Sequence, residues 1–338
     1  MSRSPAASPP SPASPWDWRP GEPSLLLQPL TLLRLDGPDT RRFLHGQTTQ
    51  AIEAAAPGAR LSACCVGPTA RMKALVEVLV DADGAWLAIT QGDGEALHQA
   101  FDRVLFPADA VRLQPPRPAL LCTPLGPDPA APGPDPQEHW RPAEAGQGWW
   151  LGESLLLGPL SAPASAGDPA VPPAGLPAAL AGRRVLSAAE AERWRLQQGH
   201  PAIPGELNDD TNPFELGLAA RVSLGKGCYV GQETLAKLAT YDGVKQQLRR
   251  WFCVLPPGSP SQPPRPGQEL RTPEGERAGR VTSSLALADG LWIGLALVRR
   301  AQLEADGLSL AEGGVTLWMS APAELLPPPQ GPGSRPRP

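Results

Sequence analysis

The chain has 338 residues, enough for two or three domains, and its formal net charge is −4 at pH 7. This charge gives no general attraction to nucleic acid or to an anionic membrane surface, so neither is expected as a partner. The five cysteines form no CxxC pair and the four histidines do not cluster near them, so a disulfide framework or a metal or iron–sulfur site of the protein's own is unsupported.

The first 23 residues are rich in proline and serine and predict a disordered tail. They contain no apolar core, so no secretory signal is predicted, and no run of about 18 apolar residues indicates a membrane span. Cysteine usage indicates a reduced compartment, and we expect the cytoplasm. A plastid or mitochondrion is expected instead if this Ser-rich start is a transit peptide, which it weakly resembles.

The next part of the chain predicts an α+β domain with an antiparallel sheet. Strands are expected at 25–35, 61–66, 74–81, 84–90 and 110–113, of which the second to fourth form a meander. One helix is expected at 39–48, with Asp39 as its cap and Phe43 and Leu44 facing inward. A second is expected at 94–104, with Leu97, Phe101 and Val104 on one face.

Two stretches rich in proline, glycine and alanine, 115–136 and 161–177, predict loops. A single short strand is expected between them at 149–157. A helix at 188–198 is opened by a capping box of Ser187 and Glu190 and ended by Gly199.

A strand at 249–255 is expected to lead out of the first domain, and short strands at 279–284, 290–298 and 314–319 suit a small β-barrel. The predicted organisation is a tail at 1–23, an N-terminal α+β region of two subdomains at 24–248, a barrel domain at 249–326 and a tail at 327–338.

The stretch 224–238, LGKGCYVGQETLAKL, is where chemistry is expected. Glycines frame Lys226, Cys228 and Tyr229, and a helix is predicted to follow directly. A helix start and a nearby lysine both favour thiolate over thiol at Cys228. The alternative is that Cys228 is a small buried hydrophobe, the commoner fate of a single cysteine.

The segment KGCYVGQE at 226–233 resembles the signature of YgfZ-type folate-binding proteins, relatives of the glycine-cleavage T-protein, the aminomethyltransferase GcvT. The flanks GHPAIPGELNDDTNPFELGL and TYDGVKQQLRRW also resemble that family, most closely its cyanobacterial and plastid members. The resemblance covers roughly 25–321. It implies an α+β fold with a GcvT/YgfZ-like ring of three domains around a central cavity, ferredoxin-like mixed domains and a small C-terminal β-barrel.

The same resemblance implies tetrahydrofolate or another reduced folate as cofactor. Cys228 and Lys226 are the expected catalytic residues, and the expected folate-binding residues are Arg71, Arg195, Gln197, Asn208, Tyr229, Gln232 and Glu233. The segment RLQQGHP resembles the family's Arg-x-Glu-x-Gly-x-Pro, with Gln197 at the glutamate position. The alternative is that Arg195 and Gln197 form a solvated helix end.

One departure from the T-protein concerns its catalytic aspartate, because Lys73 and Ala74 stand at about that place. Neither residue can replace a negative charge, which predicts that aminomethyltransferase activity is absent. The acidic stretch 206–210 favours turns and caps, and no metal is expected. Tryptophans at 149, 150, 194 and 251 can stack on a pterin, although buried tryptophan is the commoner outcome.

The function expected from this resemblance is a folate-binding protein that supports assembly or repair of iron–sulfur clusters in other proteins. Its partners would be reduced folate and iron–sulfur client or assembly proteins, and a monomer is expected. One alternative is an aminomethyltransferase of the glycine cleavage system that acts on a lipoyl carrier protein. Another is a folate-free interaction scaffold in which Cys228 binds a partner's cluster or thiol.

Overall fold

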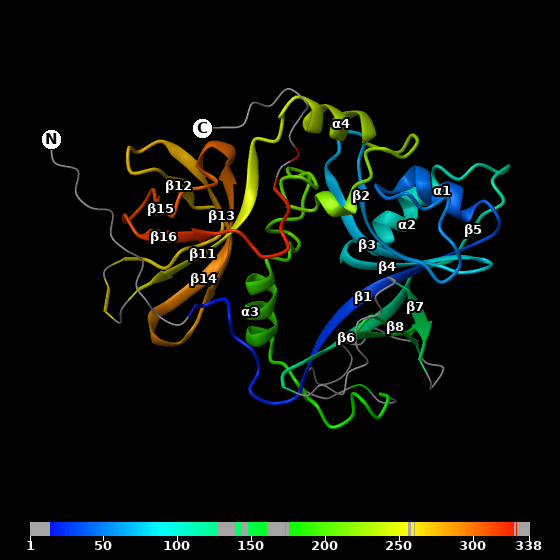
Figure 1. Cartoon of the computed structure of the whole chain (residues 1–338), viewed down its shortest axis with the longest axis horizontal. Coiled ribbons are helices and arrows are strands. Elements are labelled where there is room, and N and C mark those ends of the chain that lie inside the picture. Colours follow the sequence, from blue (N-terminus) through cyan, green and yellow to red (C-terminus); the bar gives the residue numbers. More distant parts are fainter. Residues whose placement is uncertain are drawn as a thin grey trace. The chain divides into compact units, whose positions relative to one another are not determined.

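The computed structural model describes residues 14–127, 139–143, 148–160, 173, 176–255, 258–259, 261–327 and 329. The chain divides into two compact units (Figure 1). The larger unit comprises residues 20–191, 201–245 and 326–338, and the smaller unit comprises residues 1–19, 192–200 and 246–325.

The larger unit is built on one sheet whose longest strand, β1 (Ser24–Asp36), pairs with β4 through its second half and with β6 through its first. The strand order is β2 (Arg60–Val66), β3 (Met72–Val80), β4 (Gly84–Gly92), β1, β6 (Arg117–Leu125), β9 (Ser154–Leu157), β8 (Gly148–Leu151) and β7 (Trp140–Pro142). The short strands β5 (Arg112–Leu113) and β10 (Arg184–Val185) also pair with β1. The predicted antiparallel meander is confirmed as β2, β3 and β4.

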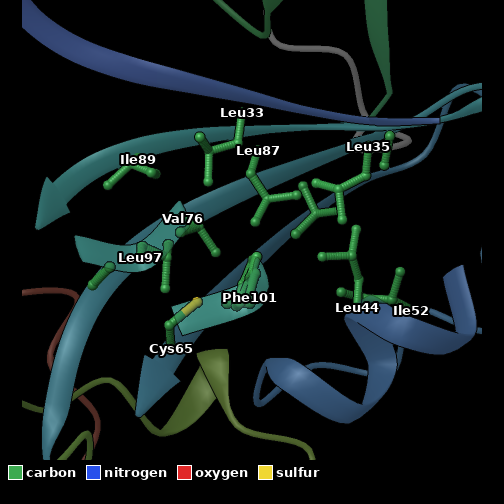
Figure 2. Packing of buried hydrophobic residues seen from close by; sticks show 14 of the residues in the cluster. Leu33, Leu35, Leu44, Ile52, Cys65, Val76, Leu87, Ile89, Leu97 and Phe101 are labelled. Atoms are coloured by element: carbon green, nitrogen blue, oxygen red, sulfur yellow. The ribbon is translucent and has the colours of Figure 1, made fainter. Parts of the chain in front are cut away.

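Two helices, α1 (Thr40–Gln47) and α2 (Gly94–Asp102), pack on the sheet and close the main core. Leu33, Leu87 and Phe101 meet in this cluster (Figure 2), and each side chain of this size contributes roughly 1.5–3 kcal/mol when buried. The rings of Phe43 and Phe101 meet edge to face with centroids 5.5 Å apart. The prediction for Val104 was wrong, because α2 ends before it and its side chain is exposed.

The predicted loop at 115–136 was wrong for residues 117–125, which form β6, while residues 128–136 lie outside the described residues. Proline content suggested a loop, yet the carbonyl of Pro118 accepts a hydrogen bond from Leu160. Because the N–H and C=O of a strand residue point to the same side, the missing N–H of Pro118 faces away from β1. The proline therefore costs no bond of the β1 ladder. The predicted loop at 161–177 lies mostly outside the described residues.

Two other local predictions need correction. The expected single strand at 149–157 is a hairpin of β8 and β9, because Gly152 adopts a left-handed φ of +63° in a two-residue turn. Asp39 stands at the N-cap position of α1 but makes no capping bond, because its carboxylate accepts from the backbone N–H of Ala110 at 3.0 Å.

The helix α3 (Ala188–Gln198) begins and ends as predicted. Ser187 and Glu190 exchange the two bonds of a capping box, and Gly199 follows at a φ of +71°. The fourth α-helix of the described residues is α4 (Gln232–Thr240), and short 3-10 turns occur at Ala219–Arg221, Ala288–Gly290 and Arg300–Gln302. None of the helices in the described part is long and apolar enough to cross a bilayer.

The smaller unit contains a closed barrel of six strands, which confirms the predicted α+β class with a small β-barrel. Its order is β11 (Gln246–Val254), β14 (Leu291–Arg299), β13 (Arg277–Ala286), β12 (Glu269–Arg271), β15 (Gly307–Leu310) and β16 (Thr316–Ser320). Trp251 fills the barrel, and its indole N–H donates to the carbonyl of Leu295 at 2.9 Å. Gly294 lets the indole in, since a Cβ there would lie 2.4 Å from the ring. The prediction of a buried tryptophan is confirmed at this position.

Candidate functional site

Cys228 is the one exposed cysteine of the five, and all five are described. The other four are buried, and burial raises the pKa of Cys64, Cys122 and Cys253 to about 12. These thiols stay protonated and behave as small hydrophobic groups. Cys228 is therefore the thiol that a reagent or substrate can reach, and the reading of Cys228 as a buried hydrophobe is wrong.

Lys226 fastens the loop that carries Cys228 to the end of α1. Its Nζ donates to the carbonyls of Thr48 at 2.7 Å and Gln50 at 2.8 Å, and to the carbonyl of His45. Burial lowers the pKa of Lys226 to about 8, whereas the three carbonyl acceptors at a helix C-terminus favour the ammonium. An ammonium has three donors. All three are used by the backbone, which leaves Lys226 none for Cys228.

The loop is held again on the other side of Cys228. The N–H of Val230 donates to the carbonyl of Gly46 at 3.0 Å, and the side-chain amide of Gln232 donates to the carbonyl of Lys226 at 3.1 Å. Gly231 then turns the chain into α4 at a φ of +81°. The turn 67–71 lies against it, since a Cβ on Gly231 would meet the carbonyl oxygen of Gly67 at 2.8 Å. Residues 226–230 thus form an arch with both ends tied to α1, which we call the cysteine arch.

Replacing Gly231 by alanine is expected to disrupt the packing of this arch. The substitution combines a left-handed φ with a clash against backbone, so we expect a loss of roughly 2–3 kcal/mol in the free energy of unfolding. Gly275→Ala is the matched control, because Gly275 has a φ of +86° with open space around it and should lose only about 1 kcal/mol. Urea unfolding of both variants measures the difference. Equal losses would contradict close packing of the turn 67–71 on the arch.

His45 is a residue of this site that the sequence did not indicate. It lies in the last turn of α1, and its Nδ1 accepts a hydrogen bond from the backbone N–H of Glu53 at 3.2 Å. Its Nε2 faces the cysteine arch, 3.7 Å from where a Cβ of Gly227 would stand. No local pattern could have joined it to the cysteine loop, because it lies 181 residues before Lys226.

The predicted folate-binding residues on and after the arch have different surroundings. Tyr229 is buried, with Lys226 Nζ 4.5 Å from its ring centroid, and burial raises the pKa of Tyr229 to about 12. Its hydroxyl is buried with no hydrogen-bond partner among the described residues. Glu233 is exposed and pairs with Lys237 at 2.6 Å. The tyrosine thus belongs to the core beneath the arch, and the glutamate to the surface of α4.

Arg71 and Asn208 lie on neighbouring segments of the larger unit. Arg71 Nη1 donates to the carbonyl of Asp210 at 2.6 Å. Asn208 closes its own turn, because its Oδ1 accepts from the N–H of Asp210 at 2.9 Å and its amide donates to the carbonyl of Pro204 at 3.0 Å. This confirms the predicted turn chemistry. Among the described residues, no group of three or more His, Cys, Asp or Glu side chains is arranged to hold a metal ion.

A carboxylate lies beside Lys73, where the sequence alone suggested none. Asp209 Oδ1 is 2.5 Å from Lys73 Nζ, and both side chains are more than half exposed. The pair joins residues 136 positions apart in the chain, so no local pattern could have indicated it.

Arg195 and Gln197 belong to the smaller unit. Arg195 Nη2 pairs with Glu192 at 2.7 Å and donates to Ser283 Oγ at 2.8 Å. Gln197 is only 2% exposed, so the alternative of a solvated helix end is wrong for it. Its Nε2 donates to the carbonyl of Trp18 at 3.1 Å, and its Oε1 is buried with no hydrogen-bond partner in the described part of the chain.

The segment 16–19, which composition assigns to the tail, packs in the smaller unit through three cation–π contacts. Trp16 lies under Arg250 at 4.6 Å and Trp18 under Arg193 at 5.0 Å, measured from each guanidinium carbon to the ring centroid. Arg19 in turn lies over Trp194 at 4.7 Å. These contacts hold the Trp18 carbonyl at Gln197 and engage Trp194, one of the tryptophans considered for pterin stacking.

Known proteins resemble this chain both in sequence and in fold. A provisionally named chloroplast transferase of Arabidopsis thaliana is 28% identical over 271 residues, which cover 74% of this chain and 59% of the relative. The tRNA-modifying protein YgfZ of Sodalis glossinidius is 30% identical over 113 residues, covering 31% of this chain and 33% of the relative. The chain thus spans less than two thirds of the length of these relatives. No protein-family model matches the chain.

Among solved structures, aminomethyltransferase T of the glycine cleavage system from Bartonella henselae is similar, with a TM-score of 0.64. The alignment covers 92% of this chain and 88% of that one at 19% identity. At this identity the likeness establishes the fold and leaves the chemistry to the residues of the site.

Proposed function

We propose that this chain, which is similar to YgfZ-type proteins in sequence and to an aminomethyltransferase in fold, binds tetrahydrofolate or another reduced folate and supports assembly or repair of iron–sulfur clusters in client proteins. The observation that carries the proposal is the cysteine arch. It presents Cys228, the exposed cysteine, between two anchors on α1. A fixed, accessible thiol suits capture of a one-carbon unit, or exchange with a sulfur or cluster ligand of a client.

The folate part of the proposal is supported by Gln197. Leaving a buried acceptor such as its Oε1 unpaired costs about 1–3 kcal/mol, which a ligand N–H would recover. The amino-pyrimidinone edge of a pterin offers such donors, so the fit of residue and ligand is good. When bound, reduced folate supplies a carrier for one-carbon units. We propose that Arg71, Arg195, Asn208, Tyr229, Gln232 and Glu233 complete the folate-binding set. Cys228 is the proposed catalytic residue, and Lys226, expected from the sequence to be catalytic as well, holds the loop of Cys228 in place.

The proposal extends to organisation and partners. We propose iron–sulfur client or assembly proteins as partners, a monomeric state, and domains at 24–248 and 249–326. The compartment proposed is the cytoplasm, or a plastid as in the name of the Arabidopsis relative.

Saturable binding of tetrahydrofolate is the first expected result. In an anaerobic titration followed by tryptophan quenching, the wild type and Cys228→Ala should both bind, because Cys228 acts after binding. Gln197→Met, similar in size but without the acceptor, should bind roughly tenfold more weakly. The neighbouring, partly exposed Gln198 provides the control variant Gln198→Met, which should bind like the wild type. No binding by the wild type would favour the folate-free scaffold instead.

Aminomethyltransferase activity stays as a second candidate because Asp209 brings a carboxylate to Lys73. An assay of one-carbon transfer with a lipoyl carrier protein separates the two functions. Turnover that Asp209→Asn abolishes would favour the transferase, and absence of turnover would favour the cluster-related function.

A further inference from the structure

His45 lies under the cysteine arch, and contacts on both sides of Cys228 fix this arrangement. Lys226 donates to the carbonyl of His45, and Val230 donates to the carbonyl of the next residue, Gly46. Residues 227–229 therefore span the backbone of His45. The imidazole lies beneath them, with Nε2 3.7 Å from the Cβ position of Gly227, the residue directly before Cys228.

The contacts of His45 also determine which of its nitrogens carries the proton. Nδ1 accepts the backbone N–H of Glu53 at 3.2 Å, so the proton of the neutral ring is on Nε2. Burial, followed by the charge of Lys226, lowers the pKa of His45, while the carboxylate of Glu53 opposes this to a smaller degree. The ring is thus neutral at pH 7 and directs an N–H donor at the arch.

We propose that His45 is a positioning residue for Cys228, and that its Nε2–H donates a hydrogen bond to the sulfur when the sulfur is anionic. Lys226 cannot provide this bond, since its three donors are occupied by backbone carbonyls. No proton is transferred in the interaction; the donor stabilises the thiolate in place. The inference rests on the proposed function in one respect, that Cys228 is the reacting group.

Two substitutions test the roles of the two imidazole nitrogens separately. In His45→Asn the side-chain oxygen can take the place of Nδ1 and accept from Glu53, but no donor stands at the position of Nε2. In His45→Gln the longer amide can place an N–H at the position of Nε2, while the acceptor for Glu53 is lost. A structural role of His45 would make Asn the better replacement, and the proposed role makes Gln the better one.

Alkylation of the full-length protein by iodoacetamide provides the readout, because Cys228 is the exposed cysteine and Cys228→Ala gives the blank. We expect His45→Asn to move the midpoint of the pH–rate profile up by roughly one pH unit, so that alkylation at pH 7 is about tenfold slower. His45→Gln should stay close to the wild type. Equal profiles for the two variants, shifted or unshifted, would overturn the proposal.

Two glycines of the same loop give an independent pair of variants that leave His45 intact. A methyl group on Gly227 would meet Nε2 at ordinary contact distance and shield it, whereas one on Gly225 would meet nothing within 4 Å. Gly227→Ala should therefore slow alkylation at pH 7 several-fold, and Gly225→Ala should not. Identical rates would count against the inferred donor.

The tetrahydrofolate titration separates this inference from the proposed function. His45→Asn should bind folate as the wild type does, because the imidazole acts on the sulfur. A wild type that binds no folate would refute the folate proposal. The role of His45 would still be decided by the alkylation profiles of His45→Asn and His45→Gln.

Discussion

Replacing Cys228 by alanine is expected to abolish the protein's function without unfolding it. The side chain is exposed, so its loss removes no core packing, while the arch is held by backbone groups and by Lys226 and Gln232. Complementation of a strain that lacks its own copy of the protein, read out as activity of iron–sulfur enzymes, measures the loss. Thermal unfolding should give the midpoint of the wild type.

The control for this substitution is Cys122→Ala. Cys122 is fully buried in β6, so alanine should lower the free energy of unfolding by about 1 kcal/mol and leave complementation intact. Cys228→Ala should then lose function and keep its stability, whereas Cys122→Ala should lose stability and keep its function. An unchanged phenotype for Cys228→Ala would refute the role proposed for the arch.

The largest effect on stability is expected at Glu77. This carboxylate on β3 is only 5% exposed, pairs with Arg60 at 2.9 Å and Arg221 at 3.1 Å, and accepts from Ser62. Glu77→Ala leaves two partly buried guanidinium groups without their partner, which should cost roughly 3–5 kcal/mol in the free energy of unfolding. Urea unfolding measures the loss.

The exposed pair of Glu233 and Lys237 on α4 supplies the matched control, since surface pairs are screened by water. Glu233→Ala should leave the unfolding midpoint unchanged within error. A loss at Glu77 no larger than that at Glu233 would contradict the structural role assigned to the buried carboxylate.

Glu77 also makes stability depend on pH in a definite direction. Burial alone would raise its pKa, but Arg60 and Arg221 outweigh burial and hold the pKa of Glu77 below its usual value. A carboxyl whose pKa is depressed in the folded state stabilises the protein above the unfolded pKa. This contribution is lost as the pH falls through the folded value. Glu77→Gln should therefore flatten the loss of stability between about pH 5 and pH 2.

The local features of this protein could be predicted because their partners are close in the sequence. The capping box of Ser187 and Glu190 spans three residues, and the strands of the antiparallel meander follow one another along the chain with short connections. The exposed cysteine loop was found because its residues KGCYVGQE are contiguous. Such patterns fix the local hydrogen bonds and the buried face of an element.

The rest was decided by tertiary contacts between residues far apart in the chain. The prolines near 118 indicated a loop, yet that segment pairs with β1 as a strand. This is possible because the missing N–H of Pro118 faces away from β1. The sequence left open whether Gln197 binds a ligand or is solvated, and only the fold brings the carbonyl of Trp18, 179 residues away, to its buried amide.

The candidate site shows the same division. The sequence determined that a cysteine, a lysine and glycines share one loop before a helix. Only the fold decided that the three donors of Lys226 bond to backbone carbonyls at and just after the end of α1, and that Nε2 of His45 faces Gly227, the residue before Cys228. The physical reason is that a buried donor or acceptor bonds to a partner that is close in space. For residues 181 positions apart, that partner is set by how the elements pack and not by the spacing of the residues.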